Sequence, residues 1–276
     1  MPKPVLFNGD TQVWVLAVSF AAADIRCQAD KRPQSGTKGP FAAVVAVAAL
    51  HYVGQSEYRQ SGVAMFQPPI FVEDRPEIMH GLMSAHPFAT LISSATGCLT
   101  ADHVPLVLKS DHSENGVLQG HIAVANPLFC GTNEPIEVLT IFQGPQTYVT
   151  PSWYASKQEH GKVVPTWNYV VVHARGKLRF TSEPSWLLQH LEDLTNQHEG
   201  HREKPWAVSD APTDFVTRQL RGLVGFEILI KDLQGTWKVS QNKALKDWTG
   251  VKVGLEQSAG PGAAEMARLV TERARN

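Results

Sequence analysis

Two neighbouring segments gather side chains that could hold a flat, charged ligand. The first reads Pro151-Ser152-Trp153-Tyr154-Ala155-Ser156-Lys157, and after a short linker the second reads Val164-Pro165-Thr166-Trp167-Asn168-Tyr169. Aromatic faces beside a cation and hydrogen-bond donors suit an anionic ligand that carries a ring. The same residues could instead form a β-hairpin whose aromatic side chains cover a sheet face. Both interpretations require the two segments to lie on adjacent strands.

Further motifs follow in a fixed order along the chain. Tyr148 to Tyr154, with Val164 to Tyr169 and His173, resembles the signature of the PaiB family, the FMN-binding negative transcriptional regulators. Other pieces fall in that family's order, from Met65 to about Leu255: Met65-Phe66-Gln67-Pro68-Pro69, His103-Val104-Pro105-Leu106, Gly120-His121, Asn126-Pro127, Phe142-Gln143-Gly144-Pro145, His201-Arg202-Glu203, Gly222-Leu223-Val224-Gly225-Phe226 and Ser240-Gln241-Asn242. The resemblance implies an FMN-binding split barrel that forms a homodimer, with flavin near the subunit interface.

Short strands must position these residues. Turn residues separate the segments expected as strands, which are 88–94, 98–108, 117–124, 136–142, 147–150, 163–174, 177–180, 226–230 and 236–239. Helical spacing predicts helices that begin near Asp74, Pro184 and Pro212, and Asp74 with Glu77 has the spacing of a capping box. This pattern predicts a mainly β, antiparallel barrel with added helices, and the resemblance names it an FMN-binding split β-barrel.

FMN carries a phosphate dianion, and the sequence contains no Gly-rich phosphate loop. The phosphate would therefore need Lys, Arg, His or hydroxyl donors. Lys157 with Ser152 and Ser156 is the first candidate set, and His121 with Asn126 is the second. Lys157 could equally be an ordinary solvated lysine.

The flavin ring could stack on the aromatic residues of the two segments. In a strand, Trp167 and Tyr169 share one face and Asn168 points to the other, so only one of these sets can line a site. Gln241 could reach a polar flavin edge or stabilise a turn. His103 could be a ligand, a proton donor or a satisfied core group. The predicted FMN contacts are His103, His121, Asn126, Ser152, Trp153, Tyr154, Lys157, Thr166, Trp167, Asn168 and Gln241.

Residues 1–64 differ in character from the rest of the chain. They are rich in Ala and Val, and we expect a poorly structured extension or a mis-assigned start, followed by a PaiB-like domain over 65–276 with a helical C-terminal part. The apolar runs at 13–18 and 41–50 are too short to span a bilayer. Three widely spaced cysteines, Cys27, Cys98 and Cys130, fit a reducing compartment, so we expect a cytoplasmic protein.

Two functions stay open. Residues 1–64 hold six of the 25 Lys and Arg and four of the 26 Asp and Glu, which leaves a net charge of −3 for 65–276. Neither this charge nor any helix-turn-helix or zinc-finger spacing supports DNA as a direct partner of a regulator. The alternative is an FMN-dependent oxidoreductase, linked to NAD(P)H or acting as an oxidase on an unknown small molecule. No catalytic residue is assigned, and His198 with His201 lacks a third metal ligand.

Overall fold

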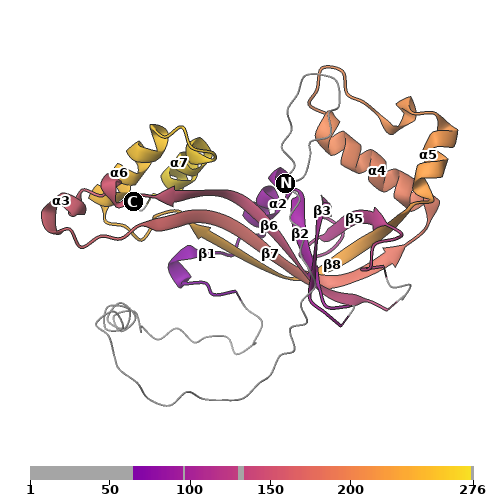
Figure 1. The fold of residues 1–276 in the computed structure, drawn as a ribbon, viewed down its shortest axis with the longest axis horizontal. Coiled ribbons are helices and arrows are strands. Elements are labelled where there is room, and N and C mark those ends of the chain that lie inside the picture. Colours follow the sequence, from indigo (N-terminus) through magenta and orange to yellow (C-terminus); the bar gives the residue numbers. More distant parts are fainter. Residues whose placement is uncertain (1–64, 96, 130–133, 275–276) are drawn as a thin grey trace, which may run out of the picture. The chain divides into compact units, whose positions relative to one another are not determined.

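Antiparallel strands form one sheet in the part of the chain that the structure describes. The computed structural model describes residues 65–95, 97–129 and 134–274, so the extension expected over 1–64 lies outside the described residues. The strand order is β3-β2-β6-β7-β8-β5-β4, and β1 pairs with β8 (Figure 1). The strands are β1 (Val72–Glu73), β2 (Phe88–Ser93), β3 (Thr100–Pro105), β4 (Val107–Lys109), β5 (Val117–Ala123), β6 (Ile136–Val149), β7 (Thr166–Thr181) and β8 (Leu223–Lys238).

The two end strands of this order are joined through a single residue. β3 pairs with β2 and β4 pairs with β5, yet only the buried Leu106 separates β3 from β4. The backbone N–H of Leu106 donates to the Pro87 carbonyl at 3.0 Å, which fixes the crossing point. The sheet must therefore curl until its ends meet, as a barrel requires. This confirms the predicted antiparallel split barrel with added helices, but the single strand expected over 98–108 is wrong because its halves pair with different neighbours.

Three strands are longer than predicted. β6, β7 and β8 have 14, 16 and 16 residues, whereas each was expected as two short strands. The expected turn at Gly144-Pro145 is a register shift within β6, and that at Arg175-Gly176 is a register shift between β7 and β8. A β-bulge absorbs extra residues without ending a strand. At Gly176 an added Cβ would lie 2.3 Å from the Leu229 carbonyl oxygen, so glycine permits the close approach.

Helices cover parts of both sheet faces. The α-helices are α2 (Pro76–Ala85), α3 (Ser156–His160), α4 (Pro184–Glu199), α5 (Thr213–Leu220), α6 (Leu245–Glu256) and α7 (Ala263–Glu272), and the 3₁₀ turns are η1 (Pro69–Phe71), η2 (Pro151–Trp153) and η3 (Val208–Asp210). α2 begins at Pro76 after Arg75, with no side-chain cap, so the capping box expected from Asp74 is wrong. Among the described residues, no helix combines the length and apolar character needed to cross a bilayer.

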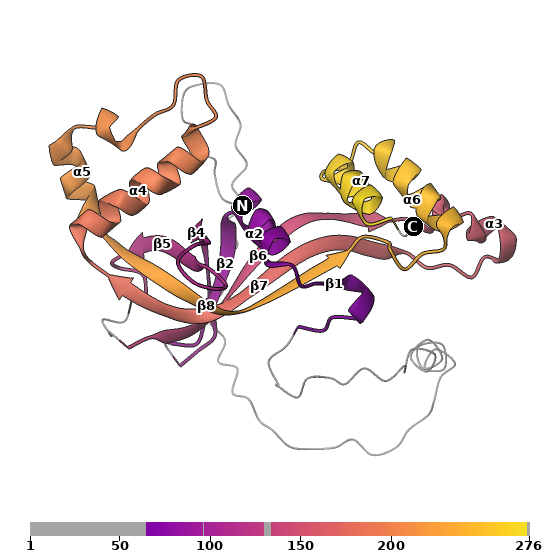
Figure 2. The ribbon, with the colours of Figure 1, turned by 180° about the vertical axis from the view of Figure 1, so that it is seen from behind.

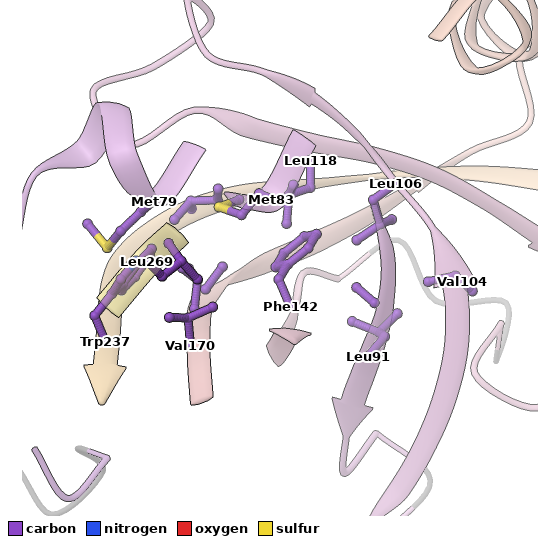
Figure 3. Close-up of a cluster of buried hydrophobic side chains, with 14 of the residues drawn as sticks. Met79, Met83, Leu91, Val104, Leu106, Leu118, Phe142, Val170, Trp237 and Leu269 are labelled. Carbon is purple, nitrogen blue, oxygen red and sulfur yellow. The ribbon is translucent and has the colours of Figure 1, made fainter. Parts of the chain in front are cut away.

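The core lies between the inner face of the sheet and helices α2 and α7. Met79 and Met83 of α2 and Leu269 of α7 are buried in one cluster with Phe142 and Trp237 from the strands (Figure 3). α4 packs instead against β4, β5 and β8, and α6 packs against α7 and η2. Figure 2 shows α6 and α7 near one end of the long strands and α4 and α5 near the other.

The opposite sheet face is partly exposed. Along β7, Asn168, Val170, Val172 and Ala174 are buried, whereas the residues between them are not. Because opposed residues of antiparallel strands share a face, the pairing defines rows across this surface. We call the surface over β3, β2, β6, β7 and the C-terminal half of β8 the open face.

Candidate functional site

Polar and apolar side chains alternate in rows across the open face. One row consists of His103, Thr90, Ile141, His173 and Gln234, on five neighbouring strands. The next row consists of Ala101, Ile92, Leu139, Arg175 and Asp232. The half-exposed apolar side chains of these rows lie between groups that can donate or accept hydrogen bonds. Such a surface suits a ligand or a partner with both characters.

Aromatic residues gather at one end of the open face. Tyr148 lies opposite Trp167, and both side chains are 48% exposed with ring centroids 6.0 Å apart. Tyr169, two residues further along β7, lies opposite Lys238, whose ammonium is 5.9 Å from the tyrosine ring centroid. We call Tyr148, Trp167, Tyr169 and Lys238 the aromatic end. Their exposed π faces and adjacent cation suit a planar anionic ligand.

A second lysine lies close to the first. The ammonium of Lys243 is 4.5 Å from the ring centroid of Tyr154. Burial and the charge of Lys243 lower the pKa of Lys238. Burial raises the pKa of Tyr154, and the nearby Asp247 and Tyr148 add to this shift. Two of the aromatic side chains of these segments, Tyr169 and Tyr154, therefore lie beside Lys238 and Lys243, which the sequence did not single out.

Trp153, a predicted flavin contact, packs against α6. A Cβ on Gly254 would lie 2.3 Å from the Trp153 ring, and one on Gly250 would lie 1.8 Å from the Trp153 carbonyl oxygen. The two glycines thus form a groove that receives this residue. One face of the indole is occupied by the helix.

Asn168 and Gln241 hold the turn that follows β8. Asn168 is fully buried, and its amide exchanges hydrogen bonds of 3.0 and 3.1 Å with the Ser240 hydroxyl. Ser240 has a φ of 67°, a strained left-handed conformation that these bonds stabilise. The Gln241 amide donates to the carbonyls of Ile70 and Trp237 and accepts from the Val239 N–H. These contacts favour the turn-stabilising alternative for Gln241.

The remaining predicted residues of the two aromatic segments are peripheral. Lys157 is exposed on α3, and its ammonium donates to the Ser152 hydroxyl at 3.2 Å. Thr166 opens β7 on the side opposite Trp167. Ser156 donates its N–H and hydroxyl to Asp247 at 2.9 and 2.7 Å, so it ties the 150–160 loop to α6.

The three predicted FMN contacts from the first half of the chain lie away from the aromatic end. His103 is on the open face, where its Nδ1 is 3.1 Å from the Thr90 hydroxyl. The Asn126 amide donates to Asp102 at 2.8 Å and accepts from the Leu128 N–H at 2.8 Å. His121 lies under α4, with its Nδ1 3.0 Å from Nε2 of His190.

The contact between His121 and α4 is a buried polar cluster. His190 stacks on Trp186, whose indole N–H donates to Glu227 at 3.2 Å. Burial lowers the pKa of His121. Burial and the neighbouring His121 lower the pKa of His190 to about 4. At neutral pH both rings are therefore uncharged, and Nδ1 of His190 has no hydrogen-bond partner.

Two further polar atoms on the open face lack partners. Nδ1 of His173 and Nε of Arg175 are buried without a hydrogen bond. Burial and the charge of Arg175 lower the pKa of His173. The only sequence signal for Arg175 is its alternation with buried residues along β7, which places it on the same face as Tyr169 and His173.

The other candidate sites among the described residues offer fewer groups that could bind a flavin. A hollow of about 410 Å³ opens between α6 and α7, lined by Glu256, Ala264, Ala267, Arg268, Thr271 and Glu272. It contains no aromatic side chain and none of the predicted residues. No cluster of three or more potential metal ligands occurs within the described ranges.

The open face fits FMN better than any other surface described above. Its aromatic end offers ring faces, and Lys238 offers a cation beside them. His173 and Arg175 offer orphaned polar atoms about 13 and 20 Å further along β7 from Tyr169, at 3.3 Å per residue. A planar ring with a polar edge and a distant anion can use all of these groups.

Comparison with known proteins points to one family. The family model described as "Putative FMN-binding domain" matches residues 65–232. The Bacillus subtilis protein "Protease synthase and sporulation protein PAI 2" is 31% identical over 211 residues, which cover 76% of this chain and 98% of that protein. The Emericella nidulans protein AN0679 is 32% identical over 244 residues, covering 76% and 97%.

Among solved structures, the Mycobacterium tuberculosis protein Rv2991 aligns with a TM-score of 0.46 at 13% identity, covering 65% of this chain and 94% of that chain. The match of the family model covers all the strands of the curled sheet except the end of β8. This chain therefore belongs to the PaiB family of FMN-binding proteins.

Proposed function

We propose that this protein binds FMN on the open face and acts as a negative transcriptional regulator through the flavin. The observation that carries the proposal is the alignment, on one face of β7, of the aromatic end with the unpartnered His173 and Arg175. FMN, when bound, supplies reversible electron transfer. The chain's own role is to lay the ring over the exposed side chains between Tyr169 and His173, and to offer Nδ1 of His173 to a polar flavin edge.

A homodimer would complete this site. His121 of β5 lies opposite Gly225 of β8, and Gly225 in turn lies opposite Thr181 of β7. Thr181 is 14 residues from Trp167, or about 46 Å along β7. One flavin cannot contact both residues in the same chain. A second copy on the open face would bring its own residues to the flavin and would bury Ile92, Leu139 and Ile141, which one chain leaves half-exposed.

The regulatory part of the proposal rests on a relative and on charge. The Bacillus subtilis relative carries a name that refers to protease synthase and sporulation, which supports regulation. The net charge of −3 over 65–276 argues against direct DNA binding, so we propose a protein partner in the cytoplasm. We expect the flavin-loaded protein to show neither sequence-selective DNA retention nor rapid reduction by NAD(P)H. Salt-sensitive DNA retention would favour a direct repressor, and rapid turnover would favour an oxidoreductase.

Flavin titration combined with light scattering tests the site and the dimer together. We expect the wild-type chain to bind one FMN per subunit and to have the mass of two chains. Ile141→Arg places a charge in the centre of the open face, so we expect single chains with at least roughly 10-fold weaker FMN binding.

Phe215→Arg is the matched control because Phe215 is similarly apolar and 45% exposed, but lies on α5. This variant should remain dimeric and bind FMN normally. A wild-type monomer that binds stoichiometric FMN would refute the dimer. A protein that takes up no FMN would refute the proposed function.

A further inference from the structure

Lys238 of the aromatic end and the nearby Lys243 form no ion pair with a carboxylate among the described residues. The lysine ion pairs of the described residues involve Lys109, Lys177, Lys231, Lys246 and Lys252, and include neither Lys238 nor Lys243. Burial lowers the pKa of Lys238, and the charge of Lys243 adds to this shift. Like charges gathered without a counter-ion are unfavourable unless an anion joins them.

Tyr154 and α6, which lie next to Lys243 in space and in sequence, carry hydrogen-bond donors without partners. Tyr154 is only 2% exposed, lies under Lys243, and its hydroxyl has no hydrogen-bond partner. The indole N–H of Trp248 is also buried without a partner. α6 begins at Leu245, two residues after Lys243, and no side chain caps its N-terminus. The charge of Lys243 helps to lower the pKa of Asp247, but the Asp247 oxygens accept hydrogen bonds from Ser156 and form no ion pair with either lysine.

We infer that Lys238 and Lys243, with the Tyr154 hydroxyl, hold the phosphate of FMN. The inference rests on the proposed flavin site and names its anionic end. A phosphate offers the acceptors that two ammonium groups, a hydroxyl and an uncapped helix N-terminus lack. The ribityl chain and the ring would then extend from the phosphate, at the row of Tyr169 and Lys238, toward the row of His173, which lies about 13 Å further along β7.

Comparison of FMN with riboflavin isolates the phosphate, because riboflavin has the same ring and ribityl chain without it. Binding of each flavin to the full chain is followed by quenching of flavin fluorescence. Lys243→Met keeps the apolar stem over Tyr154 and removes the charge. We expect FMN binding to weaken roughly 10- to 100-fold, as for loss of a charge-assisted hydrogen bond, while riboflavin binding stays within about 2-fold. Lys238→Met should act in the same direction.

Two further variants separate this inference from its competitors. Lys162→Met removes an exposed lysine from the adjacent loop and should change neither affinity. Tyr154→Phe removes the orphaned hydroxyl, so it should weaken FMN binding yet leave the empty protein as stable or more stable in urea. If the hydroxyl had only a structural role, its removal would not weaken FMN binding while leaving the stability of the empty protein unchanged or higher.

The outcomes are distinct. Preference for FMN that Lys243→Met abolishes supports the inference. Equal binding of FMN and riboflavin by the wild type overturns it and leaves the flavin site standing. Loss of the preference in Lys157→Met, but not in Lys243→Met, overturns it in favour of the Ser152 and Lys157 pair. Failure to bind either flavin overturns both the inference and the proposed function.

Discussion

Glu73 joins β1 to the segment after α7 through a buried ion triad. Its carboxylate is 1% exposed, accepts from the Arg75 guanidinium at 2.8 and 2.9 Å, and accepts from Arg273 after α7. Burial alone would raise the pKa of Glu73, but the hydrogen bonds from Arg75 and Arg273 lower it to about 2 from 4.5. A downward shift of this size corresponds to about 3 kcal/mol of folding stability. We therefore expect Glu73→Gln to lower the free energy of unfolding by about 3 kcal/mol at pH 7.

The sign of the pH dependence follows from the lowered pKa. The stabilisation by Glu73 is fully present above pH 4.5 and is lost as the pH falls toward 2, so the difference between wild type and Glu73→Gln should shrink to about 1 kcal/mol at pH 3. Urea unfolding at pH 7, 5 and 3, followed by circular dichroism, measures this difference in unfolding free energy. Glu137→Gln is the control because Glu137 is 67% exposed in its pairs with Lys177 and Lys231, and should change stability by less than about 0.5 kcal/mol. A difference for Glu73→Gln that is equally small, or independent of pH, would refute this account.

Further substitutions test the packing of α6 against Trp153 and the pH dependence of the buried His190. Gly254→Ala should destabilise the protein by about 1–3 kcal/mol because its Cβ would overlap the Trp153 ring, whereas Gly81→Ala in α2 has open space and should be neutral or slightly stabilising; thermal melts that rank them in the other order would contradict the groove. His190, uncharged in the folded protein with its pKa of about 4, contributes stability that is lost as the pH falls below 6.5, so about 2 kcal/mol should disappear by pH 5. His190→Phe keeps the stack on Trp186 and should lose much less over the same range; equal pH dependence in urea would show that other groups dominate.

Strand alternation was the most informative signal in the sequence. It correctly placed Trp167 and Tyr169 on one face of β7 and Asn168 on the other, because a two-residue period survives any error in the strand ends. The strand ends themselves were wrong at Gly144-Pro145 and Arg175-Gly176. Gly and Pro mark turns and bulges alike, and only the neighbouring strands decide whether pairing continues.

The cationic part of the site could not be predicted from local sequence. Lys157 was favoured because it lies three residues after Tyr154 and close to Ser152 and Ser156, and the structure places it exposed on α3. Lys238 is 69 positions from Tyr169 and reaches it only through the register of β7 with β8. Lys243 follows the left-handed turn at Ser240, and its ammonium lies over Tyr154, which is 89 positions earlier in the chain. Neither contact can be predicted from the spacing of residues along the chain.

These contacts change how a mutation in the aromatic segment must be interpreted. Trp153 fills the groove of α6, and α6 begins two residues after Lys243. Trp153→Ala would therefore free the helix that follows Lys243, and would weaken FMN binding even if the indole never touched the flavin. The two roles separate with riboflavin: a stacking tryptophan would reduce the affinity for both flavins, whereas displacement of α6 would reduce the affinity for FMN far more. A stability loss in Trp153→Ala similar to that of Gly254→Ala, together with a selective loss of FMN, would place Trp153 in the scaffold of the phosphate site.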